Sequence, residues 1–203
     1  ISTSFNGDIS GWNVGNVIDM SGMFLNCSTF NRNLNAWTVT NVENMTNLFK
    51  GATSYNQPMN NWNTQSTTSM ESMFEGATGF NQNLQNWRPN LRNVNTFKNM
   101  FRGATAFQNA GTGNILNWEL SGGTAGIDME GMFMNATAYN TDISFDTSGV
   151  VDMSGMFAGA TSFNSSVADL YKWNTSKVTS FENMFKGATA FNQDISTWSV
   201  QTA

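Results

Sequence analysis

The chain has 203 residues, a net charge of −5 and a charged fraction of only 11%. Its 16 Phe and 7 Trp residues indicate a chain that buries a core, because disordered chains lack such side chains. The pI of about 4.5 and the scattered Lys and Arg residues exclude nucleic acid as an expected partner. No apolar run approaches the roughly 18 residues that a membrane-spanning helix needs. Histidine is absent and cysteine occurs once, which removes the commonest general base and any disulfide framework.

A pattern of about 25 residues repeats along the whole chain. Each unit opens on an aromatic residue, namely Phe5, Phe30, Tyr55, Phe80, Phe107, Tyr139, Phe163 and Phe191. Six residues before each later opening stands a second aromatic: Phe24, Phe49, Phe74, Phe101, Phe133, Phe157 and Phe185. A third recurring position holds Trp12, Trp37, Trp62, Trp87, Trp118, Trp173 and Trp198, with Phe145 in the sixth unit. We interpret residues 1–203 as a single repeat array. We expect a fragment of a longer array, because neither end carries a polar cap.

The first unit predicts a short strand followed by a short helix. The Trp12-x-Val14 alternation is typical of a strand that points side chains to two faces. Apolar residues then follow at spacings of three and four, as on one face of a helix: Val17, Met20, Phe24 and Cys27. Asp19 would lie near the positive end of this helix.

Later units repeat these elements with additional signals for helix ends. Thr40-x-x-Glu43 resembles a capping box, and a Gly-Ala-Thr sequence after most of the second aromatic residues indicates helix termination. Asp128 and Asp152 would lie near helix N-termini. Lys50, Arg102 and Lys186 would lie near helix C-termini. The sequence therefore predicts an α/β solenoid, a leucine-rich-repeat-like right-handed superhelix of about 7.5 coils with one strand and one helix each.

At this point the pattern resembles a known family. The seventh unit carries Phe163-Asn164, Trp173, Val178, Asn183-Met184-Phe185 and Gly187-Ala188-Thr189. These residues, in this order, are similar to the repeat of BspA-like leucine-rich repeat proteins of bacterial cell surfaces. Gln108 in place of Asn and Phe145 in place of Trp depart from the pattern. The resemblance implies a solenoid, an adhesive role and an extracellular or cell-surface location, with the lumen of an organelle as the alternative. It implies no catalytic residues.

The outward side of the predicted strands is the candidate binding surface. If Trp12 and Val14 point inward, the residue between them points outward. The resulting outward column is Asn13, Thr38, Asn63, Arg88, Glu119, Asp146, Asn174 and Ser199. Amide-rich surfaces both donate and accept hydrogen bonds, which suits a protein partner or a glycan. Inserts at 88–92, 108–116, 121–126 and 166–172 would form a rim beside it.

Other columns favour structural roles. The Asn column, Asn6, Asn31, Asn56, Asn81, Asn140, Asn164 and Asn192, predicts a structural ladder that bonds backbone groups between coils. The Thr column, Thr53, Thr78, Thr105, Thr137, Thr161 and Thr189, predicts turn structure. Cys27 stands where other units have Ala, which indicates a small buried residue. Asp8, Asp142 and Asp194 share a column that other residues interrupt, so no metal site is predicted.

These observations favour a non-enzymatic protein-binding, adhesion or scaffold module at a cell surface or within a larger assembly. Two alternatives remain, a polysaccharide-binding module and a permanently bound structural subunit of a large complex. No cofactor is expected, and an enzyme is disfavoured because no acid–base set emerges.

Overall fold

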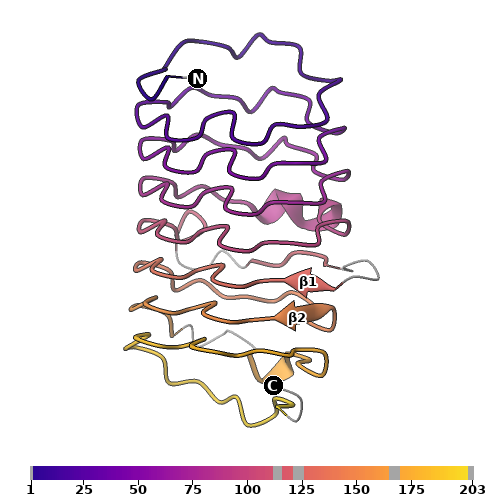
Figure 1. Cartoon of the computed structure of the whole chain (residues 1–203), viewed down its shortest axis with the longest axis vertical. Coiled ribbons are helices and arrows are strands. Elements are labelled where there is room, and N and C mark those ends of the chain that lie inside the picture. Colours follow the sequence, from indigo (N-terminus) through magenta and orange to yellow (C-terminus); the bar gives the residue numbers. More distant parts are fainter. Residues whose placement is uncertain (1, 112–115, 121–125, 165–169, 201–203) are drawn as a thin grey trace.

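The computed structural model describes residues 2–111, 116–120, 126–164 and 170–200, without the side chains of residues 88–90. The chain winds into successive turns that lie one on another along the long axis of the molecule (Figure 1). The N-terminal turn lies at the top of the view and the last described turn at the bottom. Residues about one repeat apart in the sequence are therefore neighbours in space.

Regular secondary structure is sparse. The structure has two 3₁₀ helices, η1 (Gln85–Asn90) and η2 (Leu170–Lys172), and two strands, β1 (Ile127–Asp128) and β2 (Val150–Asp152). β1 pairs with β2 in parallel, with Ile127 opposite Val150 and Asp128 opposite Asp152. The described residues contain no α-helix and are mostly turns and loops. The predicted α/β solenoid of about 7.5 coils is therefore wrong, and a leucine-rich repeat is not supported.

Hydrogen bonding explains why the expected helices do not form. In an α-helix each N–H bonds the carbonyl four residues earlier. Here the N–H of Met20 donates to the carbonyl of Asn44 at 2.9 Å, one turn further along the chain. Where a capping box was expected, the N–H of Glu43 donates to the carbonyl of Ile18 at 2.8 Å. Backbone groups that a helix would pair internally instead join neighbouring turns.

Seven equivalent stretches, which we call the wall segments, share this arrangement: 19–26, 44–51, 69–76, 96–103, 128–135, 152–159 and 180–187. Two left-handed residues interrupt each of them, such as Gly22 and Asn26 with φ of 61° and 58° in the first. L-residues do not continue a right-handed helix through such angles. Spacings of three and four arise from tight turns, as when the N–H of Met23 donates to Met20 at 3.2 Å. No helix end is present for Lys50, which instead pairs with Glu75 at 2.9 Å.

Two columns of stacked aromatic rings form the centre of the core. The rings of Phe49 and Phe74 lie 5.6 Å apart at an interplanar angle of 5°, and all the second aromatic residues stack in this way from turn to turn. The unit-opening residues form a parallel column, with 5.9 Å between Phe30 and Tyr55. A contact of 4.0 Å between Phe49 and Tyr55 joins the two columns. Equivalent aromatic side chains of successive units therefore lie in register, one above another.

The Trp residues form a third column at the edge of this core. Five indole N–H groups donate to the carbonyl of an aliphatic or Met residue of the preceding unit, at 2.8–3.2 Å: Trp37, Trp62, Trp87, Trp118 and Trp198. Trp12, in the first turn, is 54% exposed. The indole groups therefore tie one turn to the next, in addition to the backbone hydrogen bonds between turns.

Candidate functional site

The outward column lies on the surface as the in–out alternation requires. Trp37 and Val39 are buried, whereas Thr38 between them is exposed. Among the other described members, four are exposed and two are partly exposed. Asn13, Asp146, Asn174 and Ser199 are exposed, and Asn63 and Glu119 are partly exposed. The side chain of Arg88 lies outside the described part of the chain.

Several members of the column shape their own turns. The side-chain oxygen of Asn63 accepts a hydrogen bond from the N–H of Gln65 at 3.1 Å, two residues later. Equivalent bonds are made by Asn13 with Gly15 at 3.2 Å, Asp146 with Ser148 at 2.8 Å and Asn174 with Ser176 at 3.1 Å. Asn and Asp favour such turns for this reason. The regular spacing of the column therefore has a structural cause, and it is not by itself a sign of a ligand.

Two adjoining hollows lie on one part of this surface. The first, of about 330 Å³, is lined by Arg92, Asn117, Trp118, Glu119, Leu120, Ser144 and Asp146. The second, of about 200 Å³, is lined by Ile143, Ser144, Phe145, Asp146, Lys172 and Trp173. We call the two together the outer hollow. Glu119 and Asp146 of the predicted column meet there, and Arg92 forms an ion pair with Glu119. The other described members of the column do not line it.

The outer hollow lies where the repeat is irregular. The sixth unit carries Phe145 in place of Trp, and Ile143 stands two residues before it rather than three. The indole nitrogen of the buried Trp173, one turn later, has no hydrogen-bond partner among the described residues. Both departures are visible in the sequence. The predicted inserts at 108–116, 121–126 and 166–172 fall partly outside the described residues.

The Asn column makes a ladder of hydrogen bonds between turns. The side-chain oxygen of Asn31 accepts the backbone N–H of Asn56 at 3.0 Å, and that of Asn56 accepts the N–H of Asn81 at 2.9 Å. The same bond runs from Asn31 to Asn6, from Asn164 to Asn140 and from Asn192 to Asn164. At the fifth unit the N–H of Gln108 donates to Asn81 at 2.8 Å. These oxygens are therefore engaged in holding the turns together.

Three carboxylates that the sequence did not bring together lie close to one another. Oxygen atoms of Asp128, Glu130 and Asp152 lie within 4.8 Å of one another. Partial burial raises the pKa of Asp128, and the charges of Asp152 and Glu130 act in the same direction against the backbone bond from Glu130 and the charge of Lys98. Lys98 pairs with Glu130. From the sequence, Asp128 and Asp152 were expected near helix N-termini and not beside each other. Both residues occupy the same position in their units, at the start of a wall segment, and this shared position was the signal that could have brought them together.

The stacked turns define a repeat protein, and comparison with known proteins identifies its family. Residues 1–115 and 110–203 match the family described as "Mycoplasma protein of unknown function, DUF285". The chain belongs to this family, a repeat family. The resemblance to BspA-like proteins is not confirmed. No curated protein and no solved structure matches the chain. Within the described residues, no helix has the length and apolar character needed to cross a membrane.

Proposed function

We propose that the chain is a non-enzymatic repeat module that binds a protein partner at a cell surface, with an adhesive or scaffolding role. The outer hollow is its contact site. Membership of a repeat family that is often found in surface proteins supports the location. The absence of histidine from the whole chain supports a role without catalysis.

The observation that carries the proposal is an exposed tyrosine beside charged groups at the hollow. Tyr171 is 51% exposed, and the ammonium of Lys172 lies 5.4 Å from the centre of its ring. Lys172 and Asp146 line the second hollow, and Arg92 lines the first together with Asp146. Tyr and Arg are enriched at protein interfaces, where they contribute most of the binding energy. Charges of both signs within a small area suit a protein surface of complementary pattern.

A photo-cross-linking amino acid at position 171 tests this proposal. The chain is exposed to surface proteins extracted from cells of its source, and cross-linked products are identified by mass spectrometry. We expect discrete products from position 171 and none from the same amino acid at Thr53, which is exposed within the Thr column. Identical products from the two positions would contradict the proposal.

Charge-swapped variants identify the hollow itself. Arg92→Glu combined with Glu119→Arg keeps an ion pair between these two positions but exchanges the positive and the negative charge. This double variant is expected to lose the cross-linked products. The matched control, Lys98→Glu with Glu130→Lys, swaps an ion pair between two wall segments and is expected to retain them. Equal loss in both variants would indicate a general effect of charge.

A polysaccharide-binding module is the second candidate, supported by the exposed amide groups of the outward column, such as that of Asn174. A glycan array separates it from protein binding. If the array detects binding, Asn63→Ala and Asn174→Ala should abolish it. Glycan binding that neither variant changes would exclude this surface as the glycan site.

A further inference from the structure

Trp173 breaks the hydrogen-bonding pattern of the Trp column. Its side chain is only 5% exposed, and its indole N–H has no acceptor among the described residues. At Trp62, Trp87 and Trp198 this N–H donates to a backbone carbonyl of the preceding unit at 2.8–3.0 Å. A donor buried without an acceptor is costly, and native structures rarely leave one without a reason. The indole N–H of Trp173 therefore calls for an acceptor that the described residues do not supply.

The sixth unit lacks the tight turn that supplies this acceptor elsewhere. In the second unit, for example, the carbonyl of Leu34 belongs to such a turn and also accepts the indole N–H of Trp62 from the next unit. The corresponding carbonyl of Asp142 instead accepts the backbone N–H of Leu116 at 2.8 Å. Leu116 and Ile143 form a parallel bridge at this point. The backbone of the sixth unit therefore pairs with the fifth unit and leaves the indole of the seventh without its usual carbonyl.

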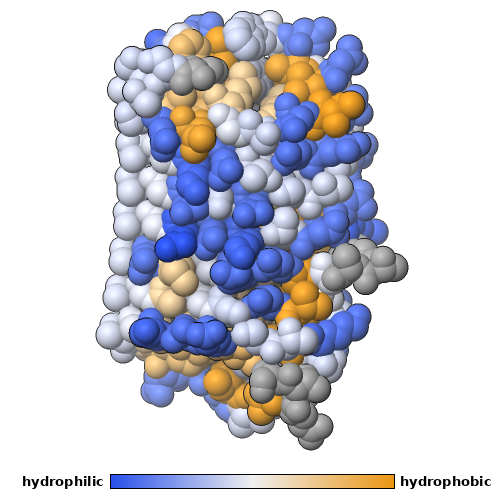
Figure 2. Space-filling view, in the orientation of Figure 1, coloured by the Kyte–Doolittle hydropathy of each residue, from blue (hydrophilic) through white to orange (hydrophobic). Residues whose placement is uncertain are grey.

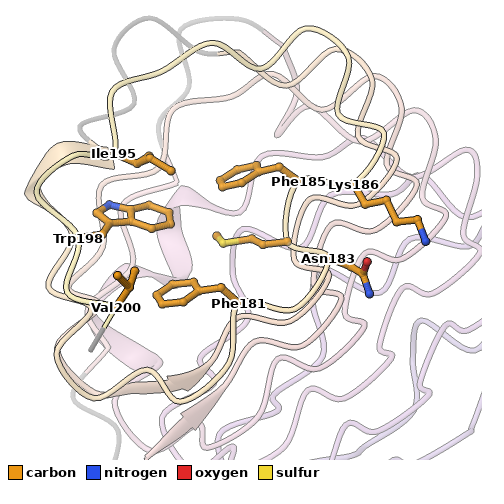
Figure 3. A pocket seen from close by; sticks show the side chains of 8 residues that line it. Phe181, Asn183, Phe185, Lys186, Ile195, Trp198 and Val200 are labelled. Carbon is orange, nitrogen blue, oxygen red and sulfur yellow. The ribbon is translucent and has the colours of Figure 1, made fainter. Parts of the chain in front are cut away.

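The missing bond is not a feature of the ends of the stack. Figure 2 shows apolar surface toward both ends and mainly hydrophilic surface between them. The last described turn has an apolar groove, across which Phe181 and Phe185 point toward Trp198 (Figure 3). Trp198 nevertheless donates its indole N–H to the carbonyl of Leu170 at 2.8 Å. The missing bond at Trp173 is therefore a local consequence of the irregular sixth unit.

Trp173 borders the second hollow, whose volume of about 200 Å³ far exceeds the space of about 15 Å³ that one water molecule needs. The indole N–H groups of the column are directed toward the preceding unit, and residues 143–146 of that unit line this hollow together with Trp173. The charged residues of the lining are Asp146 and Lys172, whose opposite charges favour a neutral ligand. The hollow thus combines a buried donor with a carboxylate acceptor.

We propose that the second hollow binds the carboxamide of an Asn or Gln side chain presented by the protein partner. The indole N–H of Trp173 donates to the amide oxygen, and the carboxylate of Asp146 accepts from the amide NH₂ group. Asp146 accepts the N–H and the hydroxyl of Ser148 at 2.8 and 2.9 Å, and its oxygens have further lone pairs. A carboxylate ligand would accept from Trp173 but would be repelled by Asp146. The inference rests on the proposed function, because the hollow belongs to its contact site.

Two small probes of the same shape, propionamide and propionate, test this assignment. Each is titrated into the isotopically labelled whole chain at neutral pH, and the indole N–H resonances are followed by NMR. The resonance that is absent from Trp173→Phe identifies the signal of Trp173. We expect propionamide to shift this signal saturably, and propionate to bind about tenfold more weakly or worse. The signal of Trp62, whose N–H is bonded to the carbonyl of Leu34, should not move.

Asp146→Asn tests the role of the carboxylate. Asn retains an oxygen that can accept the N–H of Ser148 but has no charge that opposes an anion. The variant should therefore bind propionate more tightly than the wild-type chain does and lose the preference for propionamide. Asp8→Asn is the matched control, because Asp8 accepts the N–H of Ser10 at 3.0 Å in the same kind of turn but does not line the hollow. It should leave the preference unchanged.

Four results would overturn the proposal. The first is the absence of a saturable shift at Trp173, which would leave water as the acceptor. The second is an equal shift at Trp62, which would indicate a general solvent effect. The third is equal binding of the two probes, or a preference that Asp146→Asn does not change. The fourth is tighter binding of N-acetylglucosamine than of propionamide, which would assign the hollow to a glycan.

The probe titration requires no partner protein, so its result is separate from that of cross-linking at position 171. Binding of propionamide without cross-linked products would contradict only the proposed function. Cross-linked products without binding of propionamide would contradict only the amide site.

Discussion

The indole N–H of Trp62 donates a hydrogen bond of 2.9 Å to the backbone carbonyl of Leu34, 28 residues earlier. Both residues are buried, so no water competes for this carbonyl. The bond repeats along the stack and links side-chain identity to the spacing between turns. The Trp column is therefore a part of the framework that holds successive turns in register.

Trp62→Phe should destabilise the fold, because it removes one of the two hydrogen bonds that the buried carbonyl of Leu34 accepts and leaves only the bond from the N–H of Trp37 at 3.0 Å. The expected loss is about 0.5–1.5 kcal/mol in the free energy of unfolding, measured by urea denaturation. Trp173→Phe is the matched control, because the indole nitrogen of Trp173 has no partner among the described residues. It should cost clearly less. An equal loss for the two variants would mean that ring packing, and not the hydrogen bond, determines the effect.

The sequence predicted the repeat and its in-register columns because each unit places large apolar residues at the same positions, such as Phe49 and Phe74. It failed on secondary structure because spacing alone does not separate a helix from a series of tight turns. Val17, Met20 and Phe24 fit both. Gly22 and Asn26, the two residues with positive φ, were the distinguishing signal within the same segment.

The candidate site was predictable only in outline. Residues of the outward column, such as Thr38, are exposed because the in–out alternation does not depend on strand formation. The outer hollow depends on which irregular turns meet, as with Arg92 and Glu119, and contacts of this kind do not follow from the repeat. The sequence did not predict that Asp128 and Asp152 lie together, because a helix was expected where the chain forms wall segments that pair with one another.

Asn56→Ala should weaken the connection between two turns. The side-chain oxygen of Asn56 accepts the N–H of Asn81 at 2.9 Å and the amide of Gln82 at 2.8 Å. We expect a loss of about 1 kcal/mol in the free energy of unfolding. Asn56→Asp, which keeps the acceptor, should cost less. The exposed Asn60 is the control position for Asn→Ala, and a loss there equal to that at Asn56 would contradict a specific role of the ladder.

Gly51→Ala should be destabilising for two reasons. Gly51 has a φ of 70°, and a Cβ at this position would meet the side-chain oxygen of Asn26 in the preceding turn. The left-handed conformation alone costs a non-glycine residue about 1–2 kcal/mol. Gly11→Ala is the control, because nothing lies within 4 Å of a Cβ there. Thermal unfolding should show a lowered midpoint for Gly51→Ala only, and equal midpoints would contradict the wall geometry.

Two buried tyrosines should lower the stability of the fold at alkaline pH. The hydroxyls of Tyr55 and Tyr139 have no hydrogen-bond partner among the described residues. Burial raises the pKa of Tyr55, and burial with the nearby Asp142 raises that of Tyr139, above the usual 10.0. The folded chain therefore retains protons that the unfolded chain releases above pH 10, so stability is full below that pH and falls as the pH rises through it.

The matching variants are Tyr55→Phe and Tyr139→Phe. Each removes a hydroxyl that is buried without a partner, so neither should destabilise the chain at neutral pH. The double variant should lose less stability than the wild-type chain between pH 9 and 11, in urea denaturation at each pH. An identical decline in both proteins would place the titrating groups elsewhere.

Scalar coupling across hydrogen bonds, measured by NMR on the isotopically labelled chain, reports the partner of each amide. The stacked turns predict a coupling between the amide nitrogen of Phe49 and the carbonyl carbon of Met73, whose oxygen lies 2.8 Å from that nitrogen. Equivalent couplings should join Met45 to Ser69 and Gly51 to Glu75. A coupling from Phe49 to the carbonyl of Met45, four residues earlier, would show a helix and contradict the wall segments.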